Sequence, residues 1–125
     1  MQKYLLIAIG GAAGSLLRFW VGGWATQRIH GRFWYGTFII NVTACLLIGF
    51  IMELLNRHGL MNSPWRYLIP IGFLGGYSTF SSFEWEIYSS LNISAIGLAV
   101  SYTAFSIVFG LLAVYLGVYL ARAVA

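Results

Sequence analysis

The residues from Gly72 to Phe83, inside an apolar segment, carry the groups best suited to chemistry in this chain. They read Gly-Phe-Leu-Gly-Gly-Tyr-Ser-Thr-Phe-Ser-Ser-Phe. Glycine weakens a helix, and Ser78 or Thr79 can cap a new one. The run therefore predicts a helix that ends and restarts inside a bilayer. Irregular backbone at that depth is tolerated only where protein buries it or where it lines an aqueous path, so the run is a candidate ion or substrate site.

Two phenylalanines follow the predicted break. Phe80 and Phe83 are three residues apart and share a face if the restarted segment is helical. A ring edge carries the positive end of the aromatic quadrupole, so edge-on rings can receive a small anion without a fixed charge. Packing against lipid or neighbouring helices is the alternative for both rings. Glu84 and Glu86 follow and argue against a simple anion funnel on that side, and we expect Glu86 to approach the far interface.

Polar residues at helical spacing on two other apolar segments can line a path beside the break. Thr37 and Asn41 are four residues apart, and so are Tyr102, Ser106 and Gly110, which form one stripe. The asparagine amide supplies two hydrogen-bond donors, which suit an anion. A hydroxyl and amide track between helices is one interpretation. Interhelical hydrogen bonds and close packing are the other.

The first apolar segment contains a cation, Arg18, four residues after Gly14. A cation within a span is costly and is usually paired, snorkelled or functional. Trp20 and Trp24 are typical of a nearby interface, which favours snorkelling. A positive charge at the mouth of an anion path is the functional interpretation. Gly10 and Gly14, also four apart, predict a close helix–helix approach.

Four apolar segments must position these groups. The chain is 60% hydrophobic and 8% charged, whereas a soluble domain carries about 25% charged residues. About 20 apolar residues span a bilayer as a helix. We therefore predict an all-α membrane protein, one transmembrane domain over residues 1–125 with four transmembrane helices, the third broken in mid-membrane. The predicted spans are about 4–24, 34–55, 67–90 and 93–120.

Several function classes find no support in the residues. No metal-ligand cluster, nucleophile–base pair or phosphate loop is visible, so we do not expect an enzyme. The basic residues are dispersed near segment ends, so we do not expect nucleic-acid binding. The first apolar run continues to Trp24, beyond the usual core of about 7–15 residues in a cleavable signal. Cys45 is the single cysteine, which excludes an intrachain disulfide.

Basic residues set the orientation of most membrane proteins, and their bias here is small. Four spans place both termini on one side. The two sides carry four and two basic residues, namely Lys3, Arg57, Arg66 and Arg122 against Arg28 and Arg32. We therefore expect the chain to insert in both orientations and to pair as an antiparallel homodimer with its two-fold axis in the membrane plane. A single fixed orientation is also compatible with this count.

Together these motifs resemble those of the Fluc (CrcB-type) fluoride channels. The run Gly72 to Phe83 is similar to the family signature G-F-x-G-G-x-T-T-F-S-T-F, with Ser78 and Ser82 in place of two threonines. Gly10 to Phe19 resembles the first-segment motif G-G-x-x-G-A-x-x-R-Y, and Gly36 to Asn41 resembles the second-segment motif. The resemblance extends over all four segments in order; it is specific in the third and weak in the fourth.

The resemblance implies a fluoride-selective passive channel that exports fluoride from the cytoplasm and so protects against its toxicity. It implies an antiparallel dual-topology homodimer in the lipid bilayer of the bacterial inner (plasma) membrane, with two parallel anion pores. It also implies a structural sodium ion at the dimer centre, held by the backbone carbonyls of Gly75 and Ser78. Arg18 corresponds to a vestibule arginine, and the implied pore residues are Phe80, Phe83, Asn41, Thr37, Tyr102, Ser106, Thr79 and Ser82.

Two other functions stay open. A small multidrug-type proton-coupled transporter shares the size, the four spans and the dual topology, but it needs a buried carboxylate where the first segment offers Arg18. A non-transporting membrane subunit of a larger complex is the other. Fluoride is small and strongly hydrated, so a fluoride pore must replace lost water with donors yet bind weakly enough to release the ion. Asn41, the hydroxyls and the two phenylalanines meet that requirement.

Overall fold

Three long helices form the frame of the protein. The computed structural model describes residues 1–31 and 34–124, and every regular element within that part of the chain is helical. The long helices are α1 (Gln2–Arg28), α2 (Tyr35–Arg57) and α6 (Ile96–Val124). Each is long and apolar enough to cross a membrane. They correspond to the first, second and fourth predicted spans, with bounds that differ by one to four residues.

The third predicted span is broken, which confirms the prediction from the glycine and hydroxyl run. The chain passes through α3 (Pro64–Arg66), the π-helix η1 (Tyr67–Leu74) and α4 (Gly75–Tyr77). Residues 78–79 are extended, with ψ angles of 158° and 113°. The helix then restarts as α5 (Phe80–Asn92). The two halves of this span are therefore separate helices that can point in different directions.

The π-helical turn before the break was not anticipated from the sequence, and Pro70 accounts for it. Proline lacks an N–H group, and in an α-helix its ring clashes with the carbonyl four residues earlier. The wider turn of a π-helix relieves this clash, and such turns occur frequently at functional sites. Pro70 is buried and lies inside η1. The widened turn carries the chain directly into α4 and the break.

Glycines set the closest approaches between helices. A Cβ atom added at Gly14 of α1 would overlap the backbone carbonyl of Phe73, and one at Gly10 would also meet the backbone of η1. Gly49 and Gly117 play the same part between α2 and α6, because a Cβ on either would overlap the backbone of the other helix. The predicted close approach at Gly10 and Gly14 is confirmed.

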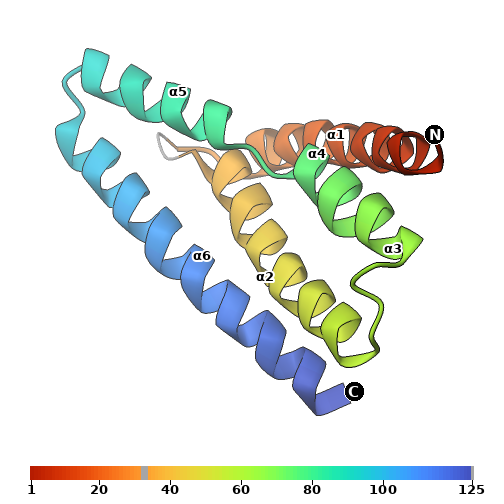
Figure 1. Cartoon of the computed structure of the whole chain (residues 1–125). Coiled ribbons are helices and arrows are strands. Elements are labelled where there is room, and N and C mark those ends of the chain that lie inside the picture. Colours follow the sequence, from red (N-terminus) through yellow and green to blue (C-terminus); the bar gives the residue numbers. More distant parts are fainter. Residues whose placement is uncertain (32–33, 125) are drawn as a thin grey trace.

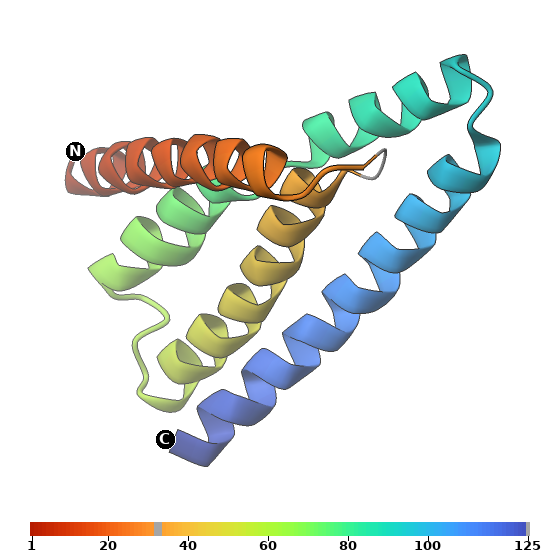
Figure 2. The same cartoon turned by 180° about the vertical axis from the view of Figure 1, so that it is seen from behind.

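The helices group in two pairs, with α5 apart from both (Figure 1). One pair is α1 with the segment from α3 to α4, and the other is α2 with α6, which run side by side in the same direction in both views (Figure 2). A small apolar core of Ile40, Ala44, Leu74 and Tyr77 lies where α2 meets the segment before the break. From the break, α5 leaves the bundle and returns to it through α6.

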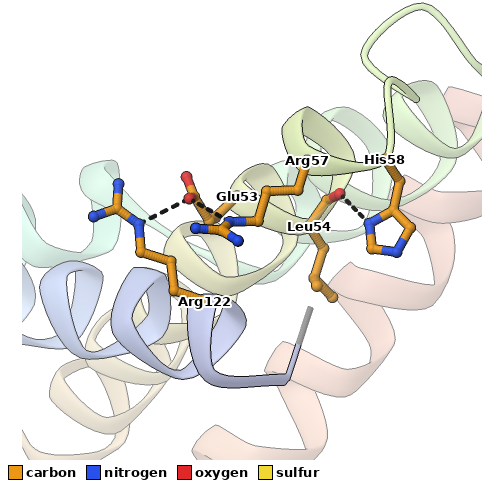
Figure 3. A network of polar contacts seen from close by, with 5 residues as sticks. All are labelled: Glu53, Leu54, Arg57, His58 and Arg122. Atoms are coloured by element: carbon orange, nitrogen blue, oxygen red, sulfur yellow. Dashed lines mark hydrogen bonds and ion pairs between the residues drawn. The ribbon is translucent and has the colours of Figure 1, made fainter.

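Charged contacts join the helix ends on one side of the protein. The Glu53 carboxylate accepts hydrogen bonds from Arg57 at 3.1 Å and from Arg122 at 2.8 Å, which ties the end of α2 to the end of α6 (Figure 3). Lys3 Nζ lies 5.1 Å from the centroid of the Tyr67 ring, which joins the start of α1 to the start of η1. The turn at 58–63 links these two groups, so both chain ends lie on this side of the protein (Figure 1).

Candidate functional site

A side-chain amide from α2 holds the break in the third span. Asn41 Nδ2 donates to the Thr79 carbonyl at 2.9 Å, and the Thr79 N–H donates to Asn41 Oδ1 at 2.8 Å. Backbone groups within a bilayer need internal partners. Asn41 therefore gives the Thr79 N–H the acceptor that it loses when the helix stops, and it also binds the Thr79 carbonyl. The predicted interhelical hydrogen bond of Asn41 is confirmed.

Hydroxyl groups end one helix and start the next. Ser78 Oγ donates to the Leu74 carbonyl at 2.9 Å, within the last turn before the break. Thr79 caps α5, because its Oγ1 accepts from the Ser82 N–H at 3.3 Å and donates to Ser82 Oγ at 2.9 Å. Of the two predicted caps, Thr79 is the one that the fold uses. The positive end of α5 therefore begins next to Asn41.

Arg18 reaches the break from α1. Its Nη1 atom donates to the Ser78 carbonyl at 3.2 Å. The cation is thus paired with backbone oxygen inside the protein, which snorkelling toward an interface alone would not produce. The same carbonyl is one of the two to which the resemblance assigns sodium.

The two phenylalanines lie in contact after the break but in different surroundings. Their ring centroids are 6.0 Å apart with an interplanar angle of 46°. Phe83 is 7% exposed and meets the Tyr102 ring edge-on at 5.0 Å, whereas Phe80 is 73% exposed. The predicted proximity is confirmed. Only Phe83 is enclosed by this chain, and Phe80 faces outward.

A groove of about 430 Å³ runs along the break between α2, η1, α4, α5 and α6. Ser106 Oγ is buried and, within the described part of the chain, has no hydrogen-bond partner. The groove gathers the predicted pore residues Asn41, Thr79, Phe80, Phe83 and Ser106, with Gly75 and Ser78 in the same wall. The polar stripe that contains Ser106 and the helix break therefore lie at the same site.

Glu86 joins two of the predicted pore residues, although the sequence analysis did not place it in the site; its approach to the far interface stays a prediction. Thr37 Oγ1 donates to Glu86 Oε1 at 2.5 Å, and the Tyr102 hydroxyl donates to Oε2 at 2.7 Å. Because α5 restarts at Phe80, Glu86 lies only about 9 Å along the helix from the break, at 1.5 Å per residue. Its spacing of three from Phe83 was the available signal.

A second cavity of about 710 Å³ lies on the α1 side of the break. It is lined by Arg18 and Glu86, which have opposite charges, and by the hydroxyl residues Thr37, Thr79 and Ser82. Thr79 lines both cavities, so the bonded pair of Asn41 and Thr79 lies between them. The site therefore has two parts separated by the break: the second cavity, which is lined by charged residues, and the groove, which is lined by neutral ones.

The predicted stripe on the last span is arranged as its spacing indicates. Tyr102 and Gly110 are buried, and Ser106 lies between them on the groove. A Cβ atom added at Gly110 would lie 3.4 Å from Cys45 Sγ, so the thiol packs against the glycine at that end of the stripe. The groove as a whole offers neutral donors and aromatic rings, which can solvate a small anion.

Comparison with known proteins agrees with this geometry. The family model described as "CrcB-like protein, Camphor Resistance (CrcB)" matches residues 5–118. A protein of Acidobacterium capsulatum named "Fluoride-specific ion channel FluC" is 47% identical over 93% of this chain and 93% of its own length. Proteins of the same name from Solibacter usitatus and Chloroflexus aurantiacus are 43% and 42% identical over 97% and 98% of this chain, and over 99% and 97% of their own. The chain is therefore a multi-pass membrane protein of the CrcB family.

Proposed function

We propose that this chain forms a passive, fluoride-selective channel in the bacterial plasma membrane, which lets fluoride leave the cytoplasm and so limits its toxicity. The observation that carries the proposal is the groove beside the break. It places together, at a helix break, a side-chain amide, two aromatic rings and a buried hydroxyl that has no hydrogen-bond partner among the described residues. The relatives named as fluoride channels match almost the whole chain, which supports the same function.

Neutral donors in the groove replace part of the hydration shell of fluoride. The Asn41 amide has two hydrogens and uses one on the Thr79 carbonyl, so one remains for an anion. The Ser106 hydroxyl adds a second donor. Ring edges of Phe80 and Phe83 attract an anion through the quadrupole without a fixed charge. Such groups bind an ion weakly enough to let it leave, which conduction requires.

A second copy in the opposite orientation completes the site in this proposal. The groove is open on one side, and Phe80 at its edge is 73% exposed. Irregular backbone and its polar partners are not stable against lipid, so another protein surface is needed there. The small difference in basic residues favours insertion in both orientations. Arg32, one of the residues in that count, lies outside the described residues.

A sodium ion at the centre of the dimer fits the backbone at the break. In a continuous helix the Thr79 N–H would donate to the Gly75 carbonyl, but here it donates to Asn41, which frees that carbonyl. The Ser78 carbonyl accepts one bond from Arg18 and has a second lone pair. Hard cations take oxygen ligands. Two carbonyls from each copy would surround the ion and hold the breaks together.

The two alternative functions find no support. A proton-coupled drug transporter needs a carboxylate that is free to exchange a proton and bind a cation. Both oxygens of Glu86 accept hydrogen bonds from hydroxyls, and Arg18 shares its cavity. The relatives are named as fluoride channels, which supports transport of fluoride. Their names therefore favour neither a non-transporting subunit nor an enzyme.

Anion efflux from liposomes tests the proposal. Vesicles loaded with potassium fluoride or potassium chloride receive the purified protein, and a potassium ionophore balances the charge. We expect rapid fluoride release, slow chloride release and no need for a proton gradient or a nucleotide. Protein-free vesicles are the control. Equal release of both anions would refute the selectivity, and release of neither would favour the non-transporting subunit.

A further inference from the structure

Helix α5 carries the residues of the site that follow the break, yet apolar packing within this chain holds only part of it. Its buried residues are Phe83 and Ser90. Ile87 is partly buried, and the other large apolar side chains of α5 are exposed by 48% to 73%, namely Phe80, Trp85, Tyr88 and Leu91. In both views α5 diverges from the other helices (Figures 1 and 2). Polar contacts must therefore contribute much of what fixes its direction.

Three polar contacts tie α5 to the start of α2 at successive levels. At the break, Asn41 pairs with Thr79, and one level further along α5 Thr37 donates to Glu86. The outermost contact joins Trp34, just before α2, to Ser90, with Nε1 donating to Oγ at 3.1 Å. Positions 34, 37 and 41 have the spacing of one helix face, and so do 79, 86 and 90. The first two contacts involve residues that line the groove or the second cavity, whereas the residues of the third line neither.

The Ser90 hydroxyl connects the linker before α2 to the backbone of Glu86. Ser90 is 1% exposed, and its Oγ donates to the Glu86 carbonyl at 2.9 Å while it accepts from Trp34. An indole N–H is a donor only and needs an acceptor when it leaves water. The Ser90 hydroxyl thus accepts from the Trp34 indole and donates to the Glu86 carbonyl. Its loss leaves the indole N–H without this acceptor.

We propose that Trp34 and Ser90 are positioning residues for the anion path. Their bond fixes the far half of α5, so that Glu86 stays between the hydroxyls of Thr37 and Tyr102 and Phe83 stays against the groove. Ser90 lies about 15 Å along the helix from Phe80, so a tether there controls the angle at which α5 leaves the break. This inference rests on the proposed channel function for its effect on flux, but the contact itself is tested separately.

Indole N–H resonances test the contact. The chain has five tryptophans, so ¹⁵N-labelled protein in detergent should give five indole signals. Trp34→Phe deletes one of them, and Ser90→Ala should shift that same signal. Ser89→Ala is the matched control, because the neighbouring Ser89 hydroxyl makes its bond to the Trp85 carbonyl within α5. A Trp34 signal that does not move in Ser90→Ala, or that moves equally in Ser89→Ala, overturns the proposal.

Fluoride efflux tests the positioning role. Trp34→Phe and Ser90→Ala should each lower fluoride efflux roughly two- to tenfold, the range that one neutral hydrogen bond covers. The double variant should lose no more than the stronger single variant, because both changes break one contact. Trp20→Phe, at an exposed tryptophan of α1, should keep wild-type flux.

Trp34 is 37% exposed, so the phenylalanine variant should fold and elute like the wild type. Wild-type flux in both single variants, or losses that multiply in the double variant, would overturn the positioning role. A wild-type protein that carries no fluoride refutes the proposed function instead, and the indole signals then decide by themselves whether the tether exists.

Discussion

Asn41 and Thr79 exchange two hydrogen bonds, at 2.9 and 2.8 Å, across the break in the third span. A side chain on α2 thus replaces the backbone acceptor of the Thr79 N–H and also binds the Thr79 carbonyl. Arg18 adds a third contact, to the carbonyl of the preceding residue, Ser78. The break is therefore a defined structure built by α1 and α2, and the groove that we assign to fluoride depends on it.

Replacement of Asn41 should disable the channel. Asn41→Ala leaves the N–H and the carbonyl of Thr79 without these partners, at about 1–3 kcal/mol for each buried group. We expect fluoride efflux to fall at least roughly tenfold, with a lower unfolding temperature in detergent. Asn41→Asp is the sharper variant, because it keeps the acceptor for the Thr79 N–H but places a negative charge beside the anion path. It should fold no better than Asn41→Ala, because a carboxylate oxygen then faces the Thr79 carbonyl, and it should conduct poorly. Wild-type flux in Asn41→Asp would show that the amide donor is not used.

The phenylalanine rings should act through their edges. Phe80→Ile and Phe83→Ile keep an apolar side chain but remove the quadrupole, so each should sharply reduce fluoride flux while the protein still assembles. Phe83→Ile also removes the edge-on contact with Tyr102 and should lower stability, whereas Phe80 is 73% exposed in one copy and should affect flux alone. Efflux measured beside size-exclusion profiles separates the two effects. Near-normal flux in both folded variants would make them packing residues.

The sequence predicted the break and the face of each polar stripe, because both depend on neighbours in the chain. Thr79 caps a new helix as its type allows, and Thr37 and Asn41 share a face as their spacing requires. Contacts between distant residues could not be predicted in the same way. The position of Glu86 depends on the tilt of α5, and the partner of Arg18 is a carbonyl 60 positions away. The π-helix at Pro70 also needed the structure, because proline in a span predicts a kink of unspecified form.

Alanine substitutions at two glycines of α1 should differ in their effect on the stability of the protein. A Cβ atom at Gly14 would overlap the Phe73 carbonyl, whereas one at Gly23 has nothing within 4 Å. Gly14→Ala should therefore destabilise the protein by about 1–3 kcal/mol, the range for overpacking. Gly23→Ala should be neutral or stabilising by up to about 1 kcal/mol, since alanine is the better helix former. Thermal unfolding of the two variants in the same detergent provides the comparison, and equal stability would contradict the observed packing of α1.

Both orientations should occur in one membrane. Asn62 lies in the exposed turn between α2 and α3, so Asn62→Cys on a Cys45→Ala background places one thiol in a loop. A membrane-impermeant thiol reagent added to intact cells should label about half of it, because inverted copies expose opposite sides. Permeabilised cells give the value for full labelling. Complete labelling or complete protection in intact cells would indicate a single orientation.

The reversal potential of current through the purified protein in a planar bilayer tests the central claim most directly. One chamber holds fluoride at tenfold higher concentration than the other, chloride makes up the difference, and a proton gradient is then imposed. The account predicts a reversal potential at the equilibrium potential of fluoride, about 59 mV in magnitude for a tenfold gradient of a monovalent ion and unchanged by pH. A value that follows chloride, or one that moves with the proton gradient, would contradict a passive fluoride-selective channel.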